Sequence, residues 1–209
     1  MGWWSERVVP RLTHATLNNP EVARYRERVC AGLSGDVLEL GFGTGLNLPH
    51  LPAAVRSLIA VEPSDLAWEM ASYAVGDSPV EVTRGDLRAE RISLPDASVD
   101  AVLVTLSLCT VQDPARALSE AARVLRPGGA LHFLEHGRSP DERVRRWQQR
   151  AEPLQRAMVA GCHLTRSAPE LVEVAGFRLG TVDSWYVPGP GLSKPWGYLS
   201  LGRAERPLT

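Results

Sequence analysis

A glycine-rich turn follows the first segment that the sequence predicts as a strand. The strand, Val37–Leu40, runs directly into Gly41-Phe42-Gly43-Thr44-Gly45. Glycines have no β-carbon, so the backbone of such a turn can approach a ligand closely. About 20 residues later the second predicted strand, 58–62, ends in Glu62, whose carboxylate can accept two hydrogen bonds from a ribose diol at the carboxyl edge of a parallel sheet. Together the turn and the acid indicate a cofactor that contains a nucleoside.

The residues around this turn bear on which nucleoside cofactor would fit. Dinucleotide sites use Gly-x-Gly-x-x-Gly, with the third glycine opening a helix. Leu46 holds that position here, and Glu39 precedes the turn. After the third predicted strand, 80–83, Asp86 is placed for an adenine amino group and the backbone amide of Leu87 for a ring nitrogen. A nicotinamide-dependent oxidoreductase therefore fits less well, although it and a non-catalytic cofactor-binding protein stay as alternatives.

Three residues in the second half of the chain are candidates for binding or activating a substrate other than the nucleoside cofactor. His136 follows the fifth predicted strand at the carboxyl edge, where it could act as a base or hydrogen-bonding group, or simply enter a helix. His163 and Arg166 lie between two predicted helices. Arg166 could orient an anionic substrate or lower the pKa of a thiol. The structural alternative for Arg166 is an ion pair with an acid such as Glu170.

The cysteines give no pattern of their own. Cys30, Cys109 and Cys162 are odd in number and far apart in the sequence, so neither a disulfide framework nor a zinc site is expected. We expect a reducing, cytoplasmic location. Cys162 is interpreted as a small buried apolar residue.

Strands that alternate with helices surround these residues. Apolar segments at 37–40, 58–62, 80–83, 99–106 and 130–134 are separated by helical patterns, which predicts βαβ crossovers and an α/β, doubly wound, mainly parallel sheet. Two more strands are expected at 177–187 and 198–203, and helices at 141–160 and 169–175. A helix from Pro20, with Asn19 as its N-cap, precedes the first strand. We expect one domain over 1–209, divided into a lead-in (1–35), a cofactor-binding core (36–135) and an acceptor side (136–209).

Composition limits the class of protein. The 209 residues carry a formal net charge of −1, with 44% hydrophobic and 22% charged residues. A dedicated nucleic-acid binder would need a cationic excess, and a membrane span would need about 18 consecutive apolar residues. Neither is present in the sequence. We expect a cytoplasmic enzyme for a small molecule, and the sequence does not indicate an oligomeric state.

The motifs at Glu39–Gly45, Glu62, Gly85-Asp86, 98–106 and 125–129 together resemble class I S-adenosylmethionine-dependent methyltransferases. The resemblance implies a Rossmann-like, seven-stranded sheet, mostly parallel with strand seven antiparallel. A narrower resemblance, to the methyltransferase-like 7 group of alkyl thiol methyltransferases and its small bacterial relatives, rests on the following segments: Arg24–Arg26, Gly45–Pro49, Val61–Ser64, Leu134–His136 and Gly161–Arg166. The vertebrate members carry an N-terminal membrane anchor, which is not seen in this sequence.

The resemblance implies S-adenosyl-L-methionine as the methyl donor and S-adenosyl-L-homocysteine as the product. The acceptor would be a small-molecule thiol, hydroxyl or amine that attacks the methyl group in an in-line displacement. A small molecule is favoured because 105–108 lacks the Asn/Asp-Pro-Pro-aromatic segment of enzymes that methylate base amino groups. From the residues themselves, Trp3 and Trp4 could form a lid over an apolar acceptor, or contact a membrane surface or a partner chain, and His14 could cap the pocket. The expected cofactor-binding set, in which Tyr25 and Arg26 enter on the resemblance, is Tyr25, Arg26, Glu39, Gly41, Gly43, Gly45, Asn47, Glu62, Pro63, Asp86, Leu87, Thr105, Leu106 and Ser107.

Overall fold

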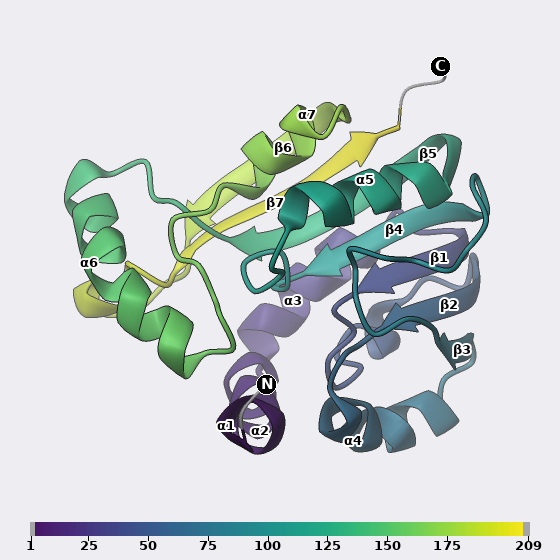
Figure 1. The fold of residues 1–209 in the computed structure, drawn as a ribbon, viewed down its shortest axis with the longest axis horizontal. Helices are drawn as coiled ribbons and strands as arrows, with labels where there is room; N and C mark the ends of the chain where they lie inside the picture. Colours follow the sequence, from purple (N-terminus) through teal and green to yellow (C-terminus); the bar gives the residue numbers. More distant parts are fainter. Residues whose placement is uncertain (1–2, 207–209) are drawn as a thin grey trace.

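The computed structural model describes residues 3–206, apart from the Ser5 side chain, and shows a central twisted sheet with helices packed against it (Figure 1). The strands are β1 (Gly35–Leu40), β2 (Val55–Val61), β3 (Glu81–Arg84), β4 (Val99–Thr105), β5 (Leu125–His136), β6 (Arg178–Tyr186) and β7 (Tyr198–Glu205). Over these residues the sheet has seven strands in the order β3-β2-β1-β4-β5-β7-β6, with β7 antiparallel to both neighbours. The predicted doubly wound fold is confirmed. Residues 1–2 and 207–209, which the single-domain prediction includes, lie outside the described residues.

Strand β4 shows why the central strands carry continuous apolar runs. Val102 and Val104 pack into one core cluster, together with residues of helices α5 and α7. Their neighbours Ala101 and Leu103 face the opposite side and join the cluster that contains residues of α3 and α4. A strand covered on both faces buries every side chain, so it has no polar alternation.

The helices agree with the sequence pattern at most of their ends. They are α1 (Trp3–Arg7), α2 (Val9–Leu17), α3 (Pro20–Cys30), α4 (Asp65–Gly76), α5 (Pro114–Val124), α6 (Glu142–Met158) and α7 (Ala168–Val174), with 3₁₀ turns η1 (Leu48–His50) and η2 (Gly191–Ser193). The predicted N-cap is confirmed, because the Asn19 side chain accepts hydrogen bonds from the amides of Glu21 and Val22. Between β1 and β2 the described chain forms only the single turn η1.

One strand boundary differs from the prediction. The sequence predicts a strand over 130–134, whereas β5 already begins at Leu125. Pairing with β4 explains the difference: Leu125 lies opposite Val99, and Ala130 lies opposite Ala101, so the residues between them form an irregularity inside the strand. Gly128, with φ of 76°, allows the chain to turn there without ending the pairing.

The two N-terminal helices lie between α4 and α6 (Figure 1). The indole Nε1 of Trp4 donates a hydrogen bond to the carbonyl of Met158, the last residue of α6 (2.8 Å). His14 Nδ1 lies 2.7 Å from the hydroxyl of Thr44 in the glycine-rich turn. The lead-in therefore contacts both the turn and the acceptor-side helix, which is the placement that a lid requires. None of the helices within residues 3–206 combines the length and apolar composition of a membrane span.

Candidate active site

The glycine-rich turn after β1 has a backbone conformation that favours glycine. Gly41 and Gly43 have φ values of 77° and 61°. A β-carbon on Gly41 would lie 2.4 Å from Ser107 Cβ, so the turn after β4 packs directly against it. A β-carbon on Gly43 would meet no atom of the described chain within 4 Å. The crest of the turn therefore borders open space, which a ligand could occupy.

The carboxylate of Glu62 is fixed against this crest. One oxygen accepts a hydrogen bond from the amide of Gly43 and the other from the amide of Ser64, each at 2.7 Å. Glu62 is buried, and burial raises its pKa against the opposing effect of the two amides. The amide of Glu62 in turn donates to the carbonyl of Asp86 (3.3 Å). The acid predicted for the ribose therefore connects the turn after β1 with the end of β3.

The residues predicted for the adenine lie at that end of β3. The Asp86 carboxylate accepts hydrogen bonds from the amide and hydroxyl of Ser93, at 2.6 and 2.8 Å, which fixes its orientation. The side chain of Leu87 is 53% exposed beside it, and Pro63 is exposed after β2. These groups form an open rim next to Glu62 and fit the flat, partly exposed end of a nucleoside.

A buried polar network lies beneath the turn. Arg26 donates to the Asn47 side-chain oxygen (2.7 Å), and the Asn47 amide group donates to Glu39 Oε1 (2.6 Å) and to the Thr105 hydroxyl (2.9 Å). Burial raises the pKa of Glu39 to about 8. Glu39 Oε2 and Arg26 Nε are buried and have no hydrogen-bond partner among the described residues. An unpaired acceptor and an unpaired donor suit a ligand that carries both an ammonium and a carboxylate group, such as the methionine part of S-adenosylmethionine.

Three other predicted cofactor residues have different surroundings. The Tyr25 hydroxyl donates to Glu21, and its ring packs at a tilt against Trp185 of β6, with the ring centroids 4.9 Å apart. These contacts direct the side chain towards β6 and not towards the glycine-rich turn. Ser107 is brought there, and its hydroxyl donates to the carbonyl of Leu40. Leu106 lies between Thr105 and Ser107 with φ of 53°, which turns the chain sharply at the end of β4.

The acceptor side begins at the end of β5. Glu135 is buried, and its Oε1 accepts hydrogen bonds from the amides of Ser107 and Leu108, at 2.7 and 2.9 Å. It thereby ties β5 to the turn after β4. A cavity of about 260 Å³ opens beside it and is lined by groups that include His136, Arg138 and Tyr198.

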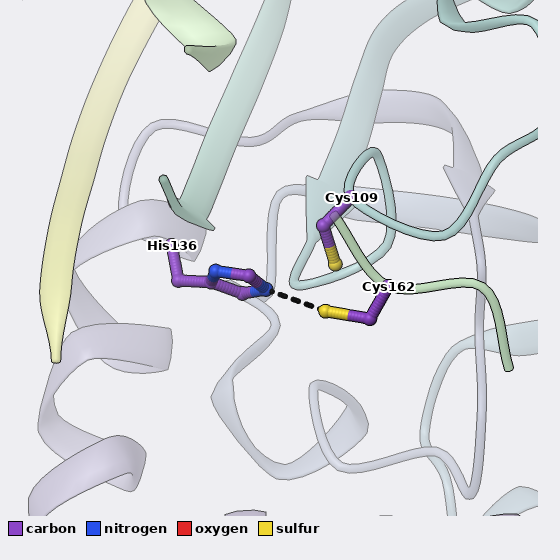
Figure 2. Close-up of side chains that lie close together, drawn as sticks. All are labelled: Cys109, His136 and Cys162. Atoms are coloured by element: carbon purple, nitrogen blue, oxygen red, sulfur yellow. Dashed lines mark hydrogen bonds between the residues drawn. The ribbon is translucent and has the colours of Figure 1, made fainter. Parts of the chain in front are cut away.

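His136 faces two cysteine side chains (Figure 2). Its Nε2 lies 3.1 Å from the sulfur of Cys162, and Cys109 completes a group whose ligand atoms all lie within 4.8 Å of one another. Burial alone would lower the pKa of His136, but the neighbouring Cys162 raises it by a larger amount. The pKa of Cys162 is lowered by hydrogen bonds from the Cys109 thiol and from His136. The His136 ring and the Cys162 thiol therefore each favour the charged form of the other. Cys162 is buried, as predicted, but Cys109 and His136 lie beside it, so the expectation of no Cys/His cluster was wrong.

The other two acceptor-side candidates support this group. His163 is hydrogen bonded to Glu152 of α6 (2.9 Å), and its amide donates to the carbonyl of Cys109. Arg166 donates to the carbonyls of Leu108 and Val111, at 2.6 and 2.7 Å. Its suggested ion pair with Glu170 is absent, because Arg138 pairs with Glu170 instead. His163 and Arg166 therefore join the segment after α6 to the turn after β4.

Comparison with known proteins places this arrangement among methyltransferases. Residues 38–133 match the family described as a methyltransferase domain. The thiol S-methyltransferase TMT1B of Homo sapiens is 36% identical over 185 residues, covering 84% of this chain and 73% of the relative. The TMT1B of Rattus norvegicus is 34% identical over 187 residues, with the same coverage.

Solved structures agree on the fold. A SAM-dependent methyltransferase of Thermotoga maritima superposes with a TM-score of 0.69 at 25% identity, covering 97% of this chain and 98% of that one. The YcgJ protein of Bacillus subtilis reaches a TM-score of 0.71 at 16% identity, over 88% of this chain and 97% of its own, and supports the fold alone.

Proposed function

This chain belongs to the S-adenosylmethionine-dependent methyltransferase family that includes the thiol S-methyltransferases TMT1A and TMT1B, and on that premise we propose that it moves a methyl group from S-adenosyl-L-methionine to a small-molecule thiol. The observation that carries the proposal is the open crest at Gly43, held by the Glu62 carboxylate and joined through it to Asp86. The choice of a thiol acceptor is supported by the relatives, whose similarity extends over 84% of the chain.

Each part of the proposed cofactor site has a distinct task. The turn from Gly41 to Gly45 lets the backbone pass close to the methionine part, Glu62 holds the ribose, and Asp86 with Leu87 faces the adenine. The network of Arg26, Glu39, Asn47 and Thr105 receives the ammonium and carboxylate groups, because it holds an unpaired acceptor and donor. A cationic ligand bound beside Glu39 and Glu62 would favour their ionised forms and oppose the burial that raises the pKa of both groups.

The chain's contribution to methyl transfer is mainly alignment and exclusion of water. S-adenosylmethionine supplies a methyl group that is already activated by its attachment to a positively charged sulfur. The acceptor sulfur must reach that carbon from the opposite side, so its position has to be fixed within a few tenths of an ångström. The lead-in helices cover the edge through the contacts of Trp4 with Met158 and of His14 with Thr44. We assign them the role of a lid that keeps water from the reacting atoms.

A thiol acceptor also has to lose its proton. Of the three acceptor-side candidates, His136 lies at the end of β5 and directs its Nε2 at the Cys162 sulfur. We propose that His136 acts at the acceptor, as its predicted position suggests. His163 and Arg166 are proposed as positioning residues, because their side chains are engaged with Glu152 and with backbone carbonyls.

Paired acceptors test this function. Purified protein is incubated with methyl-labelled cofactor and, separately, with an alkyl thiol, alcohol and amine that share one carbon skeleton. We expect labelled thioether from the thiol and little product from the other two. Transfer to the alcohol or amine without transfer to the thiol would overturn the acceptor assignment. Tight binding of S-adenosylhomocysteine without transfer to any acceptor would favour the non-catalytic alternative. Tighter binding of NAD would favour the oxidoreductase, which the relatives do not support.

A further inference from the structure

Three side chains that can bind a metal, each from a different segment, meet at the carboxyl edge of the sheet. Cys109 lies in the turn after β4, His136 ends β5, and Cys162 lies in the segment after α6. Their ligand atoms lie within 4.8 Å of one another (Figure 2). With Zn–S of about 2.3 Å and Zn–N of about 2.0 Å, the ligand atoms of a tetrahedral zinc site lie roughly 3.6–3.8 Å apart. Shifts of about an ångström or less would therefore allow the three atoms to share one ion.

We propose that Cys109, His136 and Cys162 bind Zn²⁺ through two sulfurs and one imidazole nitrogen, and that the remaining coordination position takes the sulfur of the acceptor thiol. The proposal of a zinc site is supported by the positions of the three side chains alone. The assignment of its open position rests on the proposed function.

The donor set favours zinc over the hard cations. Two thiolates and one imidazole suit a borderline-soft ion, whereas Mg²⁺ and Ca²⁺ prefer oxygen ligands. Two thiolates would also balance the charge of a divalent ion in a buried site. Cys109 and Cys162 are each only 3% exposed, so the ion would be largely shielded from solvent.

Within the described chain, the three groups mainly contact one another, with the Gln155 side chain as a further partner of Cys162. The Cys109 sulfur has the carbonyl of Leu106 as its acceptor at 3.8 Å, a long contact. His136 directs its Nε2 at the Cys162 sulfur (3.1 Å). A shared cation would use the Nε2 lone pair together with lone pairs of both sulfurs.

The segments that carry the two cysteines are held together by other contacts. The amide of His163 donates to the carbonyl of Cys109 (2.8 Å), and Arg166 bonds the carbonyl of the adjacent Leu108. Glu135 secures the same turn through the amides of Ser107 and Leu108. Rigid support of this kind keeps ligands at a fixed separation, as metal sites require.

Three protein ligands leave zinc one open position, which in catalytic sites holds water or substrate. A thiol bound there would release its proton to solvent at a lower pH than it does when free. The thiolate sulfur would then form a bond to the methyl carbon while the carbon–sulfur bond of the cofactor breaks. The bonding electron pair stays on the cofactor sulfur, so the sulfonium becomes a neutral thioether. This step needs no oxidant and leaves the ion unchanged.

Metal binding is tested first on the unaltered protein. Reduced, metal-stripped protein is titrated with Co²⁺ and then Zn²⁺ without oxygen. We expect one Co²⁺ per chain, a near-ultraviolet charge-transfer band from thiolate ligands, and displacement by Zn²⁺. X-ray absorption at the zinc edge should show both sulfur and nitrogen ligands. Absence of stoichiometric binding, or an ion without sulfur ligands, would overturn the proposal.

Variants locate the ion. Cys109→Ser and Cys162→Ser should each lower zinc affinity by more than the ~10–100-fold that loss of a supporting group costs. Cys30→Ser changes a buried cysteine outside the cluster and should leave affinity within about twofold once folding is confirmed by circular dichroism. Unchanged zinc affinity in both cluster variants would overturn the assignment. If the variants do not fold, the X-ray absorption spectrum of the unaltered protein identifies the ligands instead.

The open position has its own readout. Adding the alkyl thiol to the Co²⁺ form should shift its visible absorption, and the alcohol of the same skeleton should not. No shift with thiol, or an equal rate of methyl transfer in the metal-free protein, would overturn this part alone. Zinc binding without any methyl transfer would instead leave the metal site standing and contradict the proposed function.

Discussion

The carboxylate of Glu62, at the end of β2, accepts a hydrogen bond from the backbone amide of Gly43 at the crest of the turn after β1 (2.7 Å). This contact links the two sequence features that first indicated a nucleoside cofactor. Because the second carboxylate oxygen is held by the Ser64 amide, the acid cannot rotate freely. The proposed ribose site is therefore formed by the protein alone, and little reorganisation is needed to bind the cofactor.

Glu62→Ala should weaken binding of S-adenosylhomocysteine by about 1.5–3 kcal/mol, the typical loss for a hydrogen bond to a charged group. Calorimetric titration measures this directly. Asp65→Asn is the matched control, since Asp65 is a nearby acid whose side chain is 91% exposed and which pairs with Arg84. Equal affinity of Glu62→Ala and the unaltered protein would show that the ribose lies elsewhere.

Gly43→Ala should reduce cofactor affinity by at least tenfold, because the new methyl group would project into the open space proposed for the ligand. It also places a non-glycine residue at positive φ, which costs about 1–2 kcal/mol of folding free energy. Gly176→Ala separates the two effects. Gly176 has φ of 88° and similarly open surroundings after α7, so this variant should lose stability but retain affinity. If Gly43→Ala and Gly176→Ala bind the cofactor with similar affinity, the cofactor does not bind at the crest.

Stability should depend on pH through Glu39. Burial raises its pKa from 4.5 to about 8, so the folded chain holds this proton more tightly than the unfolded chain. The resulting stabilisation is complete below pH 4.5 and is lost as the pH rises through about 8. Glu39→Gln removes the titration. Urea unfolding between pH 5 and 8 should therefore show the variant gaining stability relative to the unaltered protein as the pH rises. A constant difference across that range would contradict the assignment.

Trp4→Phe should loosen the proposed lid. It keeps an aromatic ring but removes the hydrogen bond to Met158, worth about 0.5–1.5 kcal/mol, so dissociation of S-adenosylhomocysteine should accelerate by up to about tenfold. Stopped-flow displacement measures the rate. The control is Trp3→Phe, since Trp3 is 71% exposed. If the two variants release the product at the same rate, α1 does not control release.

The arrangement of Gly43, Glu62 and Asp86 could be predicted from the sequence because each of these residues follows a strand of its own. Gly43, Glu62 and Asp86 come after β1, β2 and β3, and parallel strands bring their carboxyl ends to one edge. The buried hydrogen-bond network beneath the turn could not be predicted from residue spacing. Arg26 and Asn47 were expected near the cofactor individually, but their shared network with Glu39 depends on how α3 and η1 pack over β1.

The acceptor side was less predictable because it is built from loops. Cys109 and Cys162 are 53 residues apart in the sequence, and neither spacing nor local pattern relates them. Their approach depends on the path of the chain after α6, which His163 and Arg166 determine through contacts to the turn after β4. The available signal was topological: Cys109 and His136 each follow a strand whose end lies at the cofactor edge.

The central claim is that this edge of the sheet delivers a methyl group from S-adenosylmethionine to a thiol. Its most direct test is mass spectrometry of an alkyl thiol after incubation with purified protein and cofactor labelled in the methyl group with deuterium. We predict a thioether that carries all three deuterium atoms, formed by the unaltered protein and by Gly176→Ala, and strongly reduced with Gly43→Ala. Absence of labelled thioether from folded protein that binds S-adenosylhomocysteine would contradict the claim.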